Sequence, residues 1–157
     1  MLRLLLATLI VSILMTACGP TASATPTVMP DLNDASAVLE FLKARGLPIG
    51  ETLVYTSGTD MNELLGRPGG YMSKVAWRDT RVPAGDQINV GAGGGVEFYA
   101  DAAGARQRGE YVAKLAMKSP QFTEYTMVQG RIVLRLSKAL TPAQAEEYRA
   151  VLADLPG

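Results

Sequence analysis

Residues 122–137 have the sequence FTEYTMVQGRIVLRLS, which predicts a β-hairpin. Polar and apolar residues alternate along two runs, 122–128 and 131–137, and a period of two is typical of a strand with one buried face. The residues between the runs, Gln129-Gly130, suit a tight two-residue turn. An antiparallel pair of strands is therefore the first element that we expect.

The expected register of this hairpin explains both of its faces. Apolar residues pair on one side, Tyr125 with Leu134 and Met127 with Ile132. On the other side Glu124 falls opposite Arg135, and such a cross-strand pair of opposite charges contributes less than about 1 kcal/mol.

The residues after the hairpin predict a helix. Thr141 is its N-cap, Pro142 its first helical residue, and Gln144 has the spacing of a capping-box partner. Apolar residues at helical spacing then form its buried stripe, namely Ala145, Tyr148, Val151, Leu152 and Leu155.

Two further helices are expected upstream of the hairpin. Asp34 can cap one that covers about Ala35 to Arg45, and Asp101 can cap one that covers roughly Ala102 to Met117. The inner stripe of the second helix consists mostly of alanine and glycine. Since glycine in a helix interior costs about 1 kcal/mol, this stripe predicts that the helix backbone lies close to a sheet.

Three short strands complete the expected elements: Leu53–Thr56, Ser73–Asp79 and Val96–Ala100. A glycine-rich loop, 80–95, precedes the last of them. Its run Gly91–Gly95 invites comparison with a dinucleotide-binding fingerprint. The chain then enters a strand and not a helix, so that no helix N-terminus would face a phosphate, and we interpret the run as a mobile loop.

The order of these elements favours an α+β fold. Because a helix joins strand 96–100 to strand 122–128, we expect these two strands to be parallel, whereas the hairpin is antiparallel. The sequence therefore predicts a mixed, mostly antiparallel sheet of about five strands, with three helices packed mainly on one face.

Composition excludes several kinds of chemistry. The chain of 157 residues has no histidine and one cysteine, which excludes Ser–His and Cys–His nucleophiles. Zinc, iron and copper sites are not expected, so the prediction is no metal and no cofactor. Carboxylate, lysine or tyrosine chemistry, or calcium bound by oxygen, remains available.

The charge of the chain argues against a nucleic-acid partner. Lys and Arg number 15, as do Asp and Glu, and both signs are interspersed. Nucleic-acid binding needs a basic stripe, and none is present in this sequence.

The most distinctive polar stretch runs from Gly66 to Trp77. Four of its residues form the candidate binding surface: Arg67, Tyr71, Lys74 and Trp77. Two cations and two aromatic rings beside close-packed glycines could line a groove for a ligand or a protein partner. The alternative is a tight structural turn in which Arg67 pairs with a carboxylate and Trp77 belongs to the core.

A cluster of oxygen donors precedes this stretch. Asp60, Asn62 and Glu63 are close together in the chain, and Asp79 could approach them from the next strand. The spacing and the glycine of an EF-hand loop are missing, and capping of a single helical turn accounts for Asp60 and Glu63 without calcium.

The N-terminus of the chain has a segmented pattern. Met1–Arg3 carries one positive charge, Leu4–Met15 is almost wholly apolar, and Thr16-Ala17-Cys18 follows. The apolar part is shorter than the roughly 20 residues that span a bilayer as a helix. The run Leu14–Gly19 resembles the lipobox of bacterial lipoproteins. This resemblance implies that a lipid is attached to Cys18 and that the chain is cleaved in front of it.

The domain organisation follows from this resemblance. Residues 1–17 would be a lipoprotein signal peptide, 18–33 a lipidated N-terminus and disordered tether rich in Pro, Thr, Ser and Ala, and 34–157 a single α+β domain. The lipid on Cys18 would anchor the chain in the bacterial cell membrane, with the domain on the extracytoplasmic side.

Three segments, Leu64–Lys74, Gly95–Ala100 and Leu140–Tyr148, resemble those of small uncharacterised bacterial secreted or lipoprotein domains. The leading hypothesis is a non-catalytic binding or accessory module for an envelope protein or glycan. The alternative is a histidine-free hydrolase that cleaves envelope glycan with two carboxylates.

Overall fold

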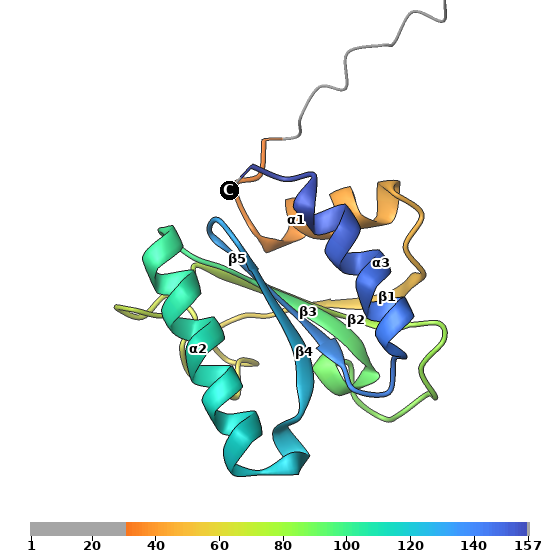
Figure 1. Ribbon diagram of the computed structural model, residues 1–157. Helices are drawn as coiled ribbons and strands as arrows, with labels where there is room; N and C mark the ends of the chain where they lie inside the picture. The colour runs from red at the N-terminus through yellow and green to blue at the C-terminus, as the bar shows by residue number, and fades with distance from the viewer. Residues whose placement is uncertain (1–30, 157) are drawn as a thin grey trace, which may run out of the picture.

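The computed structural model describes residues 31–156, and Figure 1 shows their arrangement. The elements in chain order are α1 (Ala35–Ala44), β1 (Ile49–Val54), β2 (Ser73–Asp79), β3 (Gly93–Phe98), α2 (Ala102–Lys118), β4 (Glu124–Gln129), β5 (Ile132–Ser137) and α3 (Pro142–Ala153). The strands form one sheet in the order β1-β2-β3-β5-β4. The α+β fold predicted from the sequence is confirmed.

Every pair of neighbouring strands in this sheet is antiparallel, which corrects the expectation of a mixed sheet. β3 and β4 do run in the same direction, because β5 is antiparallel to both of them. They are not neighbours, however, because β5 lies between them and pairs with both. The hairpin strand thus fills the position in which a parallel contact was expected.

The register of the hairpin differs from the prediction by two residues. Met127 pairs with Leu134 and Tyr125 with Leu136, because the two turn residues are Gly130 and Arg131 instead of Gln129 and Gly130. Gly130 has a φ of 51°, the left-handed conformation that favours glycine at the first central position of such a turn. A shift of two residues preserves the faces of a strand, so the predicted apolar side is still the buried one.

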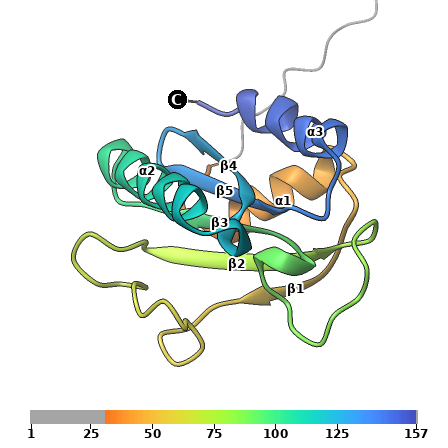
Figure 2. The ribbon, with the colours of Figure 1, turned by 60° about the horizontal axis from the view of Figure 1, so that its bottom comes forward.

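The helices cover both faces of the sheet, which corrects the expectation that they pack mainly on one. α1 and α3 lie on one side and α2 lies on the other (Figures 1 and 2). Along β5, Leu134 packs with residues of α1 and α3, whereas its neighbour Val133 packs with Ala105 of α2. We call the two sides the α1/α3 face and the α2 face.

The main apolar core lies on the α1/α3 face and is centred on Trp77. Its indole ring stacks on Tyr148 of α3 with the ring centroids 5.9 Å apart, and its Nε1 donates a hydrogen bond to the Tyr148 hydroxyl. Gly94 of β3 leaves room for this ring, because a Cβ atom there would lie 2.4 Å from Trp77 Cζ2. The expected glycine-rich loop is therefore partly wrong: Gly93–Gly95 belong to the central strand β3.

Two predictions about the helices, the capping box of α3 and the close approach of α2 to the sheet, agree with the structure. Both hydrogen bonds of the predicted capping box between Thr141 and Gln144 are present at the start of α3. The expected close approach of α2 to the sheet is also confirmed. A Cβ atom on Gly109 would lie 2.6 Å from Val128 Cγ2 on β4.

The predicted signal peptide, Cys18 and most of the predicted tether lie outside the described residues. Among residues 31–156, no helix has both the length and the apolar character that crossing a membrane requires. Leu32, near the start of the described chain, packs against the core of the α1/α3 face.

Candidate functional site

The four residues of the predicted binding surface do not form one surface, and this corrects the sequence-based candidate. Trp77 is fully buried on the α1/α3 face, whereas Lys74 and Tyr71 are buried on the α2 face. Only Arg67 is exposed, where its guanidinium lies 3.6 Å from the Glu63 carboxylate. The alternative is confirmed in its two particulars, since Arg67 pairs with a carboxylate and Trp77 belongs to the core.

The buried partner of Lys74 is Asp60. The Asp60 Oδ1 atom accepts hydrogen bonds from Lys74 Nζ at 2.9 Å and from the Tyr71 hydroxyl at 2.5 Å. Its Oδ2 atom accepts from the backbone N–H groups of Leu64 and Leu65. The predicted helical turn capped by Asp60 and Glu63 is thus replaced by a loop, 55–72, that is folded around the Asp60 carboxylate.

This arrangement leaves Asp60 no role as a calcium ligand together with Asp79. Both oxygens of Asp60 are occupied by protein donors, and Asp79 binds Arg81 and Tyr148 at the α1/α3 side. Among the described residues 31–156, no three acidic or cysteine side chains are grouped in a way that could hold a metal ion.

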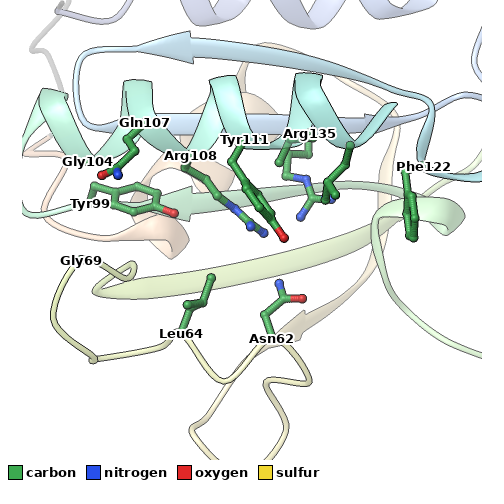
Figure 3. Close-up of a pocket in the computed structure, with 12 residues that line it drawn as sticks. Asn62, Leu64, Gly69, Tyr99, Gly104, Gln107, Arg108, Tyr111, Phe122 and Arg135 are labelled. Carbon is green, nitrogen blue, oxygen red and sulfur yellow. The ribbon is translucent and has the colours of Figure 1, made fainter. Parts of the chain in front are cut away.

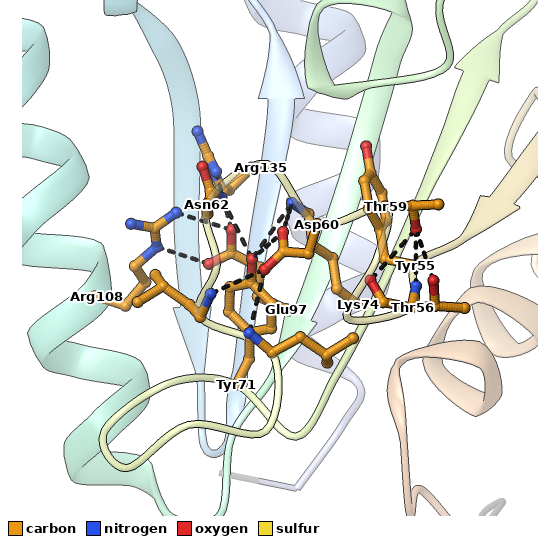
Figure 4. Close-up of polar contacts among 12 residues, drawn as sticks. Tyr55, Thr56, Thr59, Asp60, Asn62, Tyr71, Lys74, Glu97, Arg108 and Arg135 are labelled. Carbon is orange, nitrogen blue, oxygen red and sulfur yellow. Dashed lines mark hydrogen bonds and ion pairs between the residues drawn. The ribbon is translucent and has the colours of Figure 1, made fainter.

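A second buried ionic cluster lies beside the first on the α2 face (Figure 4). Glu97 of β3, with 2% of its side chain exposed, lies between two arginines. Its carboxylate accepts two hydrogen bonds from Arg108 of α2 and one from Arg135 of β5, at 2.8 to 3.0 Å. Arg135 also binds Glu124 through Nε and Nη2, so that the predicted Glu124–Arg135 pair is present as a diagonal one.

A groove opens above this cluster, between α2 and loop 55–72 (Figure 3). It has a volume of about 550 Å³. Its lining includes guanidinium groups, aromatic rings and side-chain amides. These belong to Arg108, Arg135, Tyr99, Tyr111, Phe122, Gln107 and Asn62. Tyr111 and Phe122 are 53% and 47% exposed, so two large rings face solvent at its rim.

A second cavity of about 460 Å³ adjoins the groove on the other side of Asn62. Asn62 and Arg135 line both cavities. The Asn62 amide, which both cavities share, donates to the Tyr71 hydroxyl at 3.3 Å. Together the two cavities extend across the α2 face from Phe122 of the segment before β4 to the segment 87–91.

The two buried carboxylates of this face are held in their charged form. Burial alone would raise the pKa of Asp60, but the hydrogen bonds from Tyr71 and Lys74 lower it to about 2. Burial likewise opposes ionisation of Glu97, and the hydrogen bonds and positive charges of Arg108 and Arg135 lower its pKa below the usual range. A glycosidase needs one carboxyl that is protonated at neutral pH, and neither group meets this need.

Glu97, Arg108 and Arg135 were not among the candidate site residues of the sequence, where Arg135 was predicted only as the cross-strand partner of Glu124. Arg108 lies three residues after Ala105 and four before Val112, which both belong to the buried stripe of α2. That spacing is the signal that could have placed it inward. Glu97 carries a signal as well, since it is the one charged residue of the strand Gly93–Phe98.

Comparisons of this chain with protein-family models, with curated proteins and with solved structures find no match. Function is therefore inferred from the geometry and chemistry of the groove itself.

Proposed function

We propose that this protein is a membrane-anchored extracytoplasmic lipoprotein whose domain acts as a non-catalytic binding module for an envelope component. The observation that carries the binding function is the groove over the Glu97–Arg108–Arg135 cluster. Concave sites that combine aromatic walls with a few fixed polar groups are typical of ligand recognition.

The state of the ionisable groups supports binding and not catalysis. Glu97 and Asp60 are buried, paired and charged, which suits a rigid scaffold and leaves no proton donor among them. Side chains that are already rigid lose little conformational entropy when a ligand binds, and this smaller entropic cost increases the affinity of the site.

The position of the groove suits an anchored module. Leu32 packs on the α1/α3 face, and the described chain begins on that side near its C-terminal end (Figure 1). The groove lies on the opposite face, beside α2 (Figure 3). With the lipid on Cys18 as anchor, the groove would face away from the N-terminal attachment.

Site-specific photo-cross-linking tests this proposal. A photoreactive phenylalanine analogue replaces Tyr111 in the full chain, and the matched control carries it at Arg149, an exposed position of α3 on the other face. We expect a discrete adduct with an envelope component from position 111 and none from position 149. Equal labelling from both positions, or none from 111, would contradict a binding function of the groove.

A further inference from the structure

We propose that the groove recognises a carboxylated sugar: Arg108 binds the carboxylate, and the aromatic rings of the rim pack against the sugar rings. This inference rests on the proposed binding function and names the ligand class of the same site. Its starting point is the orientation in which Glu97 holds the Arg108 guanidinium.

Arg108 presents an unused pair of donors to the groove. Its Nε and Nη2 atoms bind the two oxygens of Glu97 at 2.8 and 3.0 Å, so its side-on edge is occupied. Nη1 and the second hydrogen of Nη2 form the other edge of the guanidinium, and no described residue accepts from Nη1. Nη1 is not fully buried, and Arg108 is one of the residues that line the groove.

This donor pair is fixed in direction before any ligand arrives. Only 11% of the Arg108 side chain is exposed, and Glu97 clamps it from below. Figure 3 shows the guanidinium between α2 and the loop residues Asn62 and Leu64, beside the Tyr111 ring. Two parallel N–H donors of a guanidinium match the two oxygens of a carboxylate in a bidentate pair.

The charges around Arg108 suit a ligand group with a single negative charge. The guanidiniums of Arg108 and Arg135 share the Glu97 carboxylate. Arg135 also binds Glu124, through the Nε and Nη2 atoms of the arginine. Lys74 is already neutralised by Asp60. The positive and negative charges of these groups therefore balance, and a doubly charged phosphate would leave twice the uncompensated negative charge that a monoanionic carboxylate leaves.

The rest of the lining favours a sugar over a peptide. Tyr111 and Phe122 offer aromatic faces, whose negative potential attracts the C–H groups of a sugar ring. The amides of Gln107 and Asn62 can both donate and accept, as hydroxyl groups require. A peptide that binds by strand addition needs a free sheet edge, and the floor of the groove is formed by Arg135 of β5, a strand paired on both sides.

Calorimetric titration of the full chain in detergent tests the inference with matched probes. The acids are tetramers of galacturonate, mannuronate and guluronate, and the controls are their methyl esters and tetraglutamate. We expect at least one uronate tetramer to bind about tenfold more tightly than its ester, because the ester keeps the rings and loses the charge.

Two variants separate the roles of charge and stacking. R108K keeps the positive charge but loses the paired N–H donors of the guanidinium, so the acid and its ester should bind equally. The control is R106K, at an exposed position of the same helix, and this variant should retain the tenfold preference for the acid. Y111A retains both residues of the Glu97–Arg108 pair, so it can still test the inference if R108K does not fold. It should weaken acid and ester by the same factor.

Three results would overturn the carboxylated sugar as ligand: no uronate tetramer binds at millimolar concentration, acid and ester bind equally to the unaltered chain, or tetraglutamate binds as tightly as the uronates. If position 111 still cross-links to an envelope component in that case, the binding function stands and only the ligand class fails.

Discussion

Glu97 holds Arg108 by its side-on edge, with Nε and Nη2 of the guanidinium bonded to the two carboxylate oxygens. The pair joins the central strand β3 to α2 and fixes the direction in which the arginine meets the groove. Because Arg135 binds the same carboxylate from β5, removal of the Glu97 charge would leave two guanidiniums without their shared partner.

Replacement of Glu97 should therefore destabilise the fold. For E97Q we expect a loss of about 3 kcal/mol in the free energy of unfolding, the range found when one partner of a buried ion pair is removed. Urea denaturation measures this loss. The matched control is E110Q on the exposed side of α2, where Lys114 lies 3.9 Å away and a change within about 0.5 kcal/mol is expected. Similar losses in the two variants would refute the structural role of Glu97.

The contact between Gly94 and Trp77 gives a second prediction. G94A would place a Cβ atom 2.4 Å from Trp77 Cζ2 and 2.9 Å from Leu136 Cδ2, so the indole ring would have to shift within the core. We expect a destabilisation of about 3 kcal/mol, at the upper end of overpacking costs. G85A serves as control because no atom lies within 4 Å of its added Cβ. Thermal unfolding of both variants, with Trp77 fluorescence as the probe, should separate them clearly; a G94A variant as stable as G85A would contradict the packing described.

Acid should unfold the protein through its buried carboxylates. The pKa values of Asp60, Asp79 and Glu97 are all lowered, so the folded state binds protons more weakly than the unfolded state does. Their stabilisation is complete above the ordinary pKa of about 4 and is lost as the pH falls. For Asp60 this loss falls between pH 3.8 and about 2.

Variant D60N isolates the contribution of Asp60. It should lower stability by about 2 kcal/mol at pH 7, the equivalent of its pKa shift, and make the decline below pH 4 less steep. The measurement is the urea midpoint at a series of pH values from 7 to 2. Parallel curves for D60N and the unaltered chain would show that Asp60 does not contribute to the acid transition.

Local patterns in the sequence predict most elements but not their neighbours. Ser73–Asp79 is a strand with the predicted bounds, and the capping box at Thr141 is present. These features depend on residues within one element. The insertion of β5 between β3 and β4 depends on contacts between distant residues, which a pattern of alternation does not specify.

The site was harder to predict for a related reason. A charged residue usually faces solvent, and the sequence alone does not show that Glu97 and Arg108 neutralise each other across a strand and a helix. The glycines beside Glu97 were misleading as well. Gly93–Gly95 resemble a loop in composition, yet they form strand because the indole of Trp77 and the backbone of β2 occupy the space of their missing side chains.

The most direct test of the central claim is a map of the surface that an envelope ligand contacts. Two-dimensional NMR spectra of the full chain in detergent would be recorded during titration with isolated bacterial envelope glycan. We predict that the shifted signals cluster at the groove, with the Arg108 Nε–H, the Asn62 side-chain amide and the Gly69 and Gly104 backbone amides among them. Shifts confined to the α1/α3 face, or a spectrum unchanged at saturating glycan, would contradict the groove as the binding site for envelope glycan.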